Sequence, residues 1–371
     1  MALRESPLAS MHEAAGAKLV EFASWRLPLQ FSTIAEETRA CRTTAALFDI
    51  SHMGVFVLRG REAAPAVRRM LTKDVTAIPD GCAAYALLCN DGGGILDDLI
   101  VMVESQTAVG LVVNAANHDK DAAWLRQHLG GRDVEMDGRH GRGFAVAVQG
   151  PRAEEVVRTV ASGPLPEHFA TWAHVEMAGA RVVASRTGYT GEDGFELFGD
   201  AADGPVVWQA LLDTHLGLVP AGLAARDVLR QEMGYPLWGQ DLDEATTPLD
   251  AGLKWAIDWT GEFVGREALA RARPTRRRRG FRIEDVGVAR AGAIIYGAGE
   301  TIGRVTSGTY SHHLGAAIGQ GYIDLSAKAE VGDDVEIEVR GKRLKARLAK
   351  LPLLPAKTQP SWSKVKGKTQ P

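Results

Sequence analysis

The sequence predicts an α+β protein of more than one domain, and three observations support this class. At 371 residues the chain is long enough for two or three domains with cores of their own. Strand-like and helix-like segments interleave as far as Arg271, but the short segments that join them suit hairpins better than repeated parallel crossovers. Beyond Arg271, short strand-like runs alternate with glycine-rich turns, which is typical of a small all-β domain.

Composition narrows the class of protein further. Hydrophobic residues make up 45% of the chain and charged residues 24%, which is ordinary for a soluble globular protein. The formal net charge of -3 disfavours nucleic-acid binding, because phosphate recognition needs a positive excess. No apolar run reaches the length of a membrane span, and Met1–Ser10 lacks the apolar core of a secretory signal. The 3 cysteines are too scattered for a disulfide framework or a zinc site. We therefore expect a soluble, cytoplasmic protein with no metal, nucleic-acid or membrane partner.

Predicted elements alternate from the N-terminus to Leu129. Helices are predicted where helix formers or an amphipathic pattern occur: Met11–Leu19, Ile34–Ala46, Arg61–Leu71 and Lys120–Leu129. Strands are predicted from apolar alternation or short apolar runs: Phe48–Ile50, Gly54–Leu58, Tyr85–Cys89, Leu99–Val103 and Gly110–Asn114. The turn Gly92–Gly94 predicts a hairpin, and the run Glu21–Gln30 is expected to be a loop.

The same kind of pattern begins again at Phe144, which indicates a second lobe related to the first. A strand, a helix, a hairpin and two further helices are predicted there, over Ala145–Val148, Pro151–Val160, Val175–Ser185, Val206–Leu212 and Ala221–Met233. We therefore expect two α+β lobes built on antiparallel sheets.

The last part of the chain is predicted to be a linker, a β domain and a tail. The arginines Arg276–Arg279, close to Pro274, predict an exposed linker. Short strands are predicted over Gly280–Ile283, Thr301–Thr306, Ala316–Ile323, Asp334–Val339 and Leu344–Lys350. The stretch Lys357–Pro371 holds almost no apolar residue and is predicted to be disordered.

The first candidate for chemistry is the pair Asp97-Asp98. Adjacent residues on a strand point to opposite faces, so only one of the two can enter a given cleft, while the other faces solvent or caps the turn. An inward carboxylate next to Leu99 would be partly desolvated, as a proton acceptor or ligand-orienting group requires. The alternative, two turn-capping aspartates, remains open from this segment alone.

Two further candidates are Glu196 and Arg226. Glu196 projects from the strand face opposite Phe195 and Leu197, and its carboxylate could accept paired N–H donors of a heterocycle; an ordinary strand-edge carboxylate fits equally well. Arg226 sits among Ala and Leu on a predicted helix, where its planar fork suits a carboxylate ligand. The alternative is a structural arginine paired with a nearby acid, Asp227 or Glu232.

The order of the motifs is more specific than any one of them. The motifs are Phe22–Trp25, Leu47–Gly54, Asn90–Leu99, Val113–Asn117, Arg186–Glu196, Pro220–Arg230 and Val305–Thr309. In this order they resemble the aminomethyltransferase (T-protein) family of the glycine cleavage system, and the resemblance covers roughly residues 7–355.

The resemblance implies a fold and a division into domains. It implies a three-domain cloverleaf around a central funnel that holds tetrahydrofolate. We expect residues 1–52 and 143–270 to form a discontinuous folate-binding lobe, 53–142 a second lobe, 280–356 a C-terminal β-barrel, and 357–371 a disordered tail.

The resemblance also implies site residues. Asp98 matches the essential carboxylate of the family, Glu196 the residue that pairs with the pterin ring, and Arg226 a folate-contacting arginine. Other funnel-lining positions match Tyr85, Met53, Asn114, Tyr189 and Trp255.

The implied reaction is transfer of an aminomethyl group from the lipoyl arm of H-protein to tetrahydrofolate, with release of ammonia and no metal. One alternative is a folate-dependent demethylase of a small methylated amine or sulfonium compound on the same scaffold. A second alternative, a folate-binding assembly protein for iron–sulfur clusters, is disfavoured because Cys41, Cys82 and Cys89 lie in no Lys-Gly-Cys context.

Overall fold

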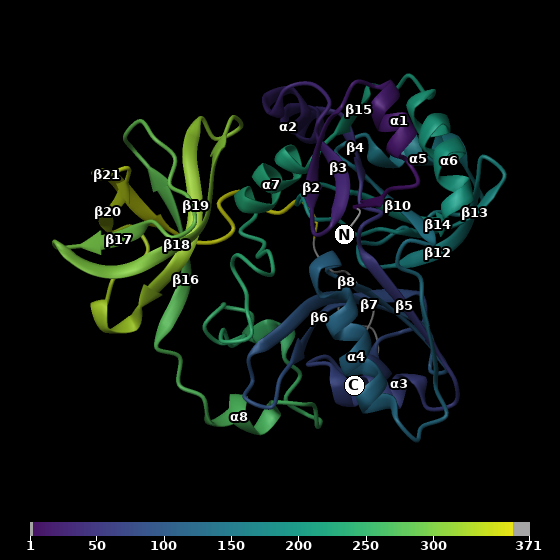
Figure 1. Cartoon of the computed structure of the whole chain (residues 1–371), viewed down its shortest axis with the longest axis horizontal. Coiled ribbons are helices and arrows are strands. Elements are labelled where there is room, and N and C mark those ends of the chain that lie inside the picture. Colours follow the sequence, from purple (N-terminus) through teal and green to yellow (C-terminus); the bar gives the residue numbers. More distant parts are fainter. Residues whose placement is uncertain (1–2, 359–371) are drawn as a thin grey trace, which may run out of the picture.

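Three large β-structures of different topology, together with a small three-stranded sheet near the N-terminus, make up the described part of the molecule. The computed structural model describes residues 3–358. Figure 1 shows a closed barrel on one side and two open sheets stacked on the other, each with its own helices. The predicted α+β class with a C-terminal β-barrel is confirmed. Within the described residues no helix is long and apolar enough to cross a membrane. Of the predicted disordered tail, all but Lys357 and Thr358 lies outside the described residues.

The first sheet has seven strands, and all neighbouring pairs are antiparallel except β15 with β4. In spatial order its strands are β11 (Ala161–Ser162), β12 (Trp172–Met177), β13 (Ala180–Ser185), β14 (Gly194–Asp200), β10 (Gly143–Gln149), β4 (Ala45–Asp49) and β15 (Leu218–Ala221). Because side chains alternate along a strand, Leu47 packs with α5 (Ala153–Val160) and α6 (Gly204–Leu212), while Phe48 packs with α2 (Ile34–Thr43) and α7 (Leu223–Glu232). The sheet is therefore covered on both faces.

The second sheet has five antiparallel strands and comes from one continuous stretch of chain. Its spatial order is β6 (Cys82–Cys89), β7 (Ile95–Ser105), β8 (Ala108–Val113), β5 (Gly54–Arg59) and β9 (Glu135–Gly138). Helices α3 (Ala63–Met70) and α4 (His118–Leu129) cover one face, and the alternate residues Leu99, Val101 and Val103 of β7 point into that core. The other face carries Ile100 and Met102, which pack toward the first sheet. The predicted hairpin around Gly92–Gly94 is present as β6 and β7.

The barrel closes through β16 and β21. Its strands are β16 (Arg276–Ile283), β19 (Ala316–Asp324), β18 (Glu300–Ser311), β17 (Ile294–Gly297), β20 (Asp334–Val339) and β21 (Lys342–Ala349). The prediction of an exposed linker over Arg276–Arg279 is wrong, because these residues open β16. The Arg278 guanidinium donates to the Gly234 carbonyl and the Gln320 side chain, both at 2.7 Å, and Arg276 donates to the Thr246 hydroxyl at 2.9 Å. Arg276 and Arg278 thus have hydrogen-bond partners within the protein, which lets this highly charged segment form a strand.

The N-terminal region differs from the prediction. The expected loop Glu21–Gln30 lies in a small sheet of β1 (Arg4–Glu5), β3 (Trp25–Gln30) and β2 (Lys18–Phe22). Ala23 and Ser24 make its tight turn with φ values of 49° and 64°. Residues other than glycine rarely adopt such values, so the sequence did not predict a turn here. The helix expected up to Leu19 is the shorter α1 (Ala9–Ala14). The helix expected up to Ala46 ends at Thr43, because Ala45 and Ala46 already belong to β4.

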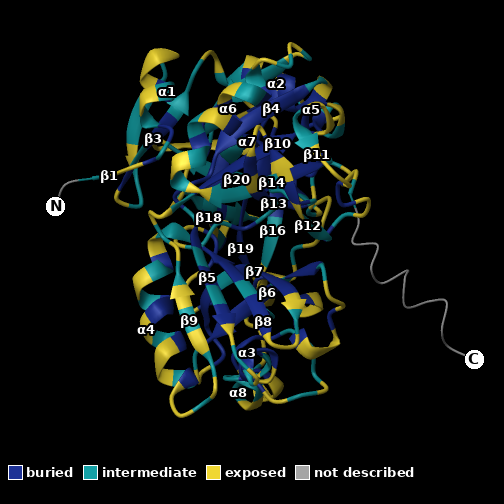
Figure 2. Ribbon diagram, turned by 90° about the vertical axis from the view of Figure 1, so that its right-hand side faces the viewer, coloured by how far each residue is buried: buried dark blue, intermediate teal, exposed yellow. Residues whose placement is uncertain are grey.

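The segment after α7 connects the three structures. Residues Leu242, Leu253, Phe263 and Leu269 form one apolar cluster with β6 and β7, and the last of them belongs to α8 (Arg266–Arg271). The sequence predicts that this segment belongs to the first lobe. Its apolar contacts are to the five-stranded sheet, while Asp241 binds Ser307 and Tyr322 of the barrel; the domain borders stay a proposal. Figure 2 shows the buried residues gathered on the central strands, with exposed residues on the outer helices and loops.

Candidate functional site

One large cavity lies where the two open sheets and the barrel meet. Its volume is about 1580 Å³, and residues of all three structures line it. All eight residues that sequence singled out are among the lining: Met53, Tyr85, Asp98, Asn114, Tyr189, Glu196, Arg226 and Trp255. They come from strands, loops and helices far apart in the chain, so the fold brings the candidates together. Their individual roles stay predictions.

The Asp98 carboxylate lies on the cavity wall formed by β7. It shares the strand face of Ile100 and Met102, because residues two apart point the same way. The Tyr85 hydroxyl donates to Oδ2 at 3.0 Å, and Asn114 Nδ2 donates to Oδ1 at 2.9 Å. Burial, and then the negative charge of Asp97, raise the pKa of Asp98 to about 7. A carboxyl group with this pKa can take up and release a proton near neutral pH.

Asp97 points to the opposite face of β7, toward α4. The expectation that the second aspartate faces solvent or caps the turn is wrong, because Asp97 is fully buried. The turn is capped instead by Asn90, whose Oδ1 accepts from the N–H of Gly94 at 2.9 Å. Asp97 accepts hydrogen bonds from Asn114 and Asn117, so the second carboxylate of the pair is part of the interior.

Glu196 reaches the cavity from β14. Its neighbours Phe195 and Leu197 are buried in the core of the seven-stranded sheet, so Glu196 emerges on the other face, as its spacing predicts. The Thr187 hydroxyl donates to its Oε2 at 2.7 Å. No described residue donates a hydrogen bond to Oε1, which leaves that oxygen available to a ligand.

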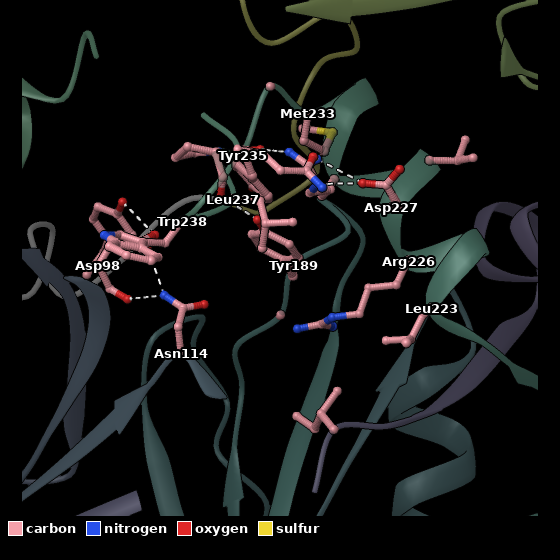
Figure 3. A pocket seen from close by; sticks show the side chains of 18 of the residues that line it. Asp98, Asn114, Tyr189, Leu223, Arg226, Asp227, Met233, Tyr235, Leu237 and Trp238 are labelled. Carbon is pink, nitrogen blue, oxygen red and sulfur yellow. Dashed lines mark hydrogen bonds and ion pairs between the residues drawn. The ribbon is translucent and has the colours of Figure 1, made fainter. Parts of the chain in front are cut away.

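Arg226 and Arg230 lie one turn apart on α7 but have different surroundings. Arg230 is buried and donates to Asp241 at 2.7 Å and to Asp227 at 2.9 Å. The Arg226 guanidinium lies 4.9 Å from the centre of the Tyr189 ring, and its Nη1 has no hydrogen-bond partner among the described residues. In Figure 3 it points into the cavity, across from Asp98 and Asn114. The alternative that Arg226 is a structural arginine paired with Asp227 or Glu232 is therefore wrong; Asp227 is a partner of Arg230.

Comparison with known proteins gives the same picture along the whole chain. Residues 8–261 match the GCVT N-terminal domain family, and residues 276–354 match the glycine cleavage T-protein C-terminal barrel domain family. The chain belongs to the glycine cleavage T-protein family of aminomethyltransferases. The aminomethyltransferase of Anoxybacillus flavithermus is 43% identical over 359 residues, with 94% of this chain and 98% of that protein aligned. The aminomethyltransferase of Thermotoga petrophila is 41% identical over 347 residues, with 92% of this chain and 95% of that protein aligned.

A solved structure agrees with the fold as well. The crystal structure of the glycine cleavage system aminomethyltransferase T from Bartonella henselae superimposes with a TM-score of 0.90 at 33% identity. The alignment covers 96% of this chain and 99% of that one. The chain is thus an enzyme of a one-carbon transferase family.

Aromatic side chains form the remaining walls of this aminomethyltransferase cavity. Tyr85 stacks on Trp255 with ring centroids 5.3 Å apart, and Trp255 is 61% exposed. The Tyr189 hydroxyl donates to the Pro236 carbonyl, which fixes its ring beside Arg226. A large exposed ring on the lining of a cavity provides an apolar surface that a flexible ligand chain can contact.

Sequence reasoning missed several residues of this site. Arg278 lines the cavity, but in the sequence it is one of four consecutive arginines that were interpreted as a linker. Lys73 also lines the cavity and donates to the Trp255 carbonyl at 3.0 Å, and it belongs to none of the motifs. Asn117 was quoted within a motif without a role, although it donates to Asp97 at 2.6 Å. The spacing Asn114-x-x-Asn117 after a strand was the signal available, since two amide side chains at a strand end commonly bind nearby polar groups.

Proposed function

We propose that this aminomethyltransferase takes the aminomethyl group from the lipoyl arm of H-protein, transfers the methylene to tetrahydrofolate, releases ammonia and leaves the arm as its dihydrolipoyl thiol. The observation that carries the proposal is the Asp98 carboxylate. It lies on the cavity wall, is held by Tyr85 and Asn114, and has a pKa of about 7. Such a group can stabilise positive charge that develops on the methylene, or accept the proton that the folate ring nitrogen loses as it bonds to the methylene.

The opposite side of the cavity supports a folate as the acceptor. A pterin ring presents paired N–H donors on one edge. One oxygen of Glu196 is bound by Thr187, and the other has no donor within the described part of the chain. Arg226 provides a cation whose Nη1 has no partner among the described residues, although burial lowers its pKa. Tetrahydrofolate supplies the nucleophilic ring nitrogen. The role of Glu196 and Arg226 is to fix that nitrogen within reach of the methylene carbon, since transfer by positioning depends on near-attack geometry.

The donor side of the reaction needs an opening wide enough for a lipoyl chain. The cavity holds about 1580 Å³, more than the ordinary volume of a small-molecule site, roughly 300–1,000 Å³. Trp255, an exposed aromatic residue on its lining, offers a surface for an apolar arm that enters from a carrier protein. A second substrate delivered on a protein arm fits this excess of space.

The test is ammonia release from aminomethylated H-protein, measured with and without tetrahydrofolate. We expect methylene-tetrahydrofolate and ammonia to form together and in equal amounts. A parallel reaction supplies a small methylated amine or sulfonium compound in place of H-protein. Product from the small molecule but not from aminomethylated H-protein would replace the proposed donor with that compound.

A further inference from the structure

Two buried carboxyl groups, those of Asp97 and Asp121, lie behind the cavity wall that carries Asp98. Asp97 and Asp98 are neighbours on β7, and Asp121 lies in the first turn of α4, which packs on the same sheet. Asp97 is 0% exposed and Asp121 is 1% exposed. Two neighbouring buried carboxylates repel one another and are poorly solvated, so ionisation of both Asp97 and Asp121 is strongly disfavoured. The cluster therefore holds a proton.

The hydrogen-bond donors around the cluster are divided unevenly. Asp97 accepts from the backbone N–H of Asn114 at 3.0 Å, from the Asn114 side chain at 2.8 Å and from the Asn117 side chain at 2.6 Å. No described residue donates a hydrogen bond to either oxygen of Asp121. Donors stabilise the ionised form of a carboxyl group, so the negative charge belongs on Asp97 and the proton on Asp121.

Asp121 and Asp97 lie within hydrogen-bonding reach of each other. Two ionised carboxylates have no hydrogen to share, and this contact becomes a hydrogen bond only when one of them is protonated. Burial, and then the charge of Asp97, raise the pKa of Asp121 to about 10. Lys120 is the cation nearest in sequence on α4, but its ammonium donates to the Leu96 carbonyl at 2.8 Å and to Glu244 at 3.0 Å.

The cluster is connected to the cavity through Asn114. The Nδ2 atom of Asn114 lies 2.8 Å from Oδ1 of Asp97 and 2.9 Å from Oδ1 of Asp98. The Tyr85 hydroxyl binds Asp98 from the other side. The position of Asp98 therefore depends on Asn114, and the position of Asn114 depends on Asp97.

We propose that Asp121 is a positioning residue for the aminomethyl transfer: it donates its proton in a hydrogen bond to Asp97, which stays ionised and holds Asn114 on Asp98. The proposal rests on the proposed function, because Asp98 is the group that acts there. Asp121 reaches the reaction only through Asp97 and Asn114. Burial, and then the charge kept on Asp97, hold the pKa of Asp98 above the ordinary aspartate range.

Infrared spectroscopy of the full-length chain tests the proton without any substrate. At a pH between the pKa of Asp98, about 7, and that of Asp121, about 10, we expect Asp98 to be ionised and Asp121 to be protonated. The protein should then show the carbonyl stretch of a neutral carboxylic acid. Asp121→Asn should remove this band, and Asp98→Asn should leave it. A spectrum without the band, or a band that survives in Asp121→Asn, overturns the proposal.

Kinetics test the positioning. Asp121→Asn keeps an N–H donor toward Asp97, whereas Asp121→Leu fills similar space with no donor. We expect Asp121→Leu to lower kcat by about tenfold or more, with the KM for tetrahydrofolate changed by less than about twofold. Asp121→Asn should recover most of that loss. Equal activity of the two variants overturns the positioning role.

The two measurements separate the failure of this inference from the failure of the proposed function. If the unsubstituted protein formed no methylene-tetrahydrofolate from aminomethylated H-protein, the proposed function would fail, and the infrared band would still decide where the proton lies. If Asp121→Leu did not fold, the infrared comparison of Asp121→Asn with the unsubstituted protein would decide it.

Discussion

The two walls of the cavity treat their polar groups in opposite ways. On the β7 wall, both oxygens of Asp98 are held by donors of the protein itself, Tyr85 and Asn114. On the wall formed by β14 and α7, Oε1 of Glu196 and Nη1 of Arg226 have no partner among the described residues. Figure 3 shows Asp98 and Arg226 on facing sides.

This difference distinguishes groups prepared for chemistry from groups prepared for binding. A group that acts on a transition state is most effective when the protein has already fixed it, because no reorganisation is then needed. A group that binds a ligand leaves its donor or acceptor free, since the ligand supplies the missing hydrogen bond. Substitutions on the two walls should therefore have different consequences.

The largest loss of stability is expected from substitution of Arg230, which has hydrogen-bond partners, in comparison with Arg226 on the same helix. Arg230→Gln leaves Asp241 buried without its cation, so the free energy of unfolding should fall by about 3–5 kcal/mol. Arg226→Gln removes a guanidinium with an unpartnered nitrogen, and the loss should be far smaller. Urea denaturation of the two variants measures both. Equal losses would mean that Arg226 also stabilises the fold.

Asp98→Asn should lower the rate of the reaction, because Asp98 is the carboxylate on the β7 wall that the protein holds in place. It keeps the shape of the side chain but cannot accept a proton, so kcat should fall by about a hundredfold or more, while folate affinity stays nearly unchanged. The matched control is Asp91→Asn in the exposed turn of the same hairpin, which should leave kcat unchanged. A comparable loss in both variants would remove Asp98 from the chemistry.

Glu196→Gln should affect the binding wall alone. One acceptor oxygen becomes an N–H donor, which leaves a pterin N–H poorly matched and should cost about 1–3 kcal/mol of folate binding. Calorimetric titration measures the affinity. Glu176→Gln, on the exposed side of β12 in the same sheet, serves as the control. Unchanged folate affinity in Glu196→Gln would place the pterin elsewhere.

The raised pKa of Asp98 predicts a dependence of stability on pH. Its pKa is about 7 in the folded protein, against about 4 for an aspartate in an unfolded chain. Between these values the folded state binds more protons, so this residue makes the protein less stable as the pH rises through that window. In Asp98→Asn the fall should be shallower. Unfolding free energies of both proteins between about pH 4 and pH 7 give the slopes, and identical slopes contradict the raised pKa.

The smallest effect is expected on the outside of the barrel. Arg276 and Arg278 have partners within the protein, so Arg277 and the nearby Arg273 are the exposed cations of this run. Reversing both to Glu should raise the apparent KM for H-protein by less than about threefold, more at low salt, because exposed charges are screened. The KM for tetrahydrofolate should not change, and Arg181→Glu on β13 is the control. No change at low salt would exclude this face as a docking surface.

Much of the fold and of the site could be predicted from the sequence. Alternating apolar residues located β7 and the hairpin that carries Asp98, and the opposite facing of Asp97 followed from strand geometry. Sequence could not show that Asp97 is buried, because its donors Asn114 and Asn117 come from another strand end. Nor could it recognise β16, where internal partners offset the charge of consecutive arginines. The roles predicted for Glu196 and Arg226 came from the family resemblance. A sequence does not show whether a charged side chain has a hydrogen-bond partner within the protein.

The way the five-stranded sheet interrupts the seven-stranded one has a consequence for synthesis on the ribosome. Strand β4 lies inside the larger sheet, next to its edge strand β15, but both of its neighbours, β10 and β15, are made only after the whole smaller sheet has emerged. The smaller sheet is continuous in sequence and can form as soon as β9 leaves the exit tunnel, since domains fold as units during translation. Until β10 and β15 are made, both edges of β4 lack a neighbouring strand. The nascent chain is therefore most exposed to aggregation before Gly143–Gln149 appears, and a translational pause in that interval would prolong the risk.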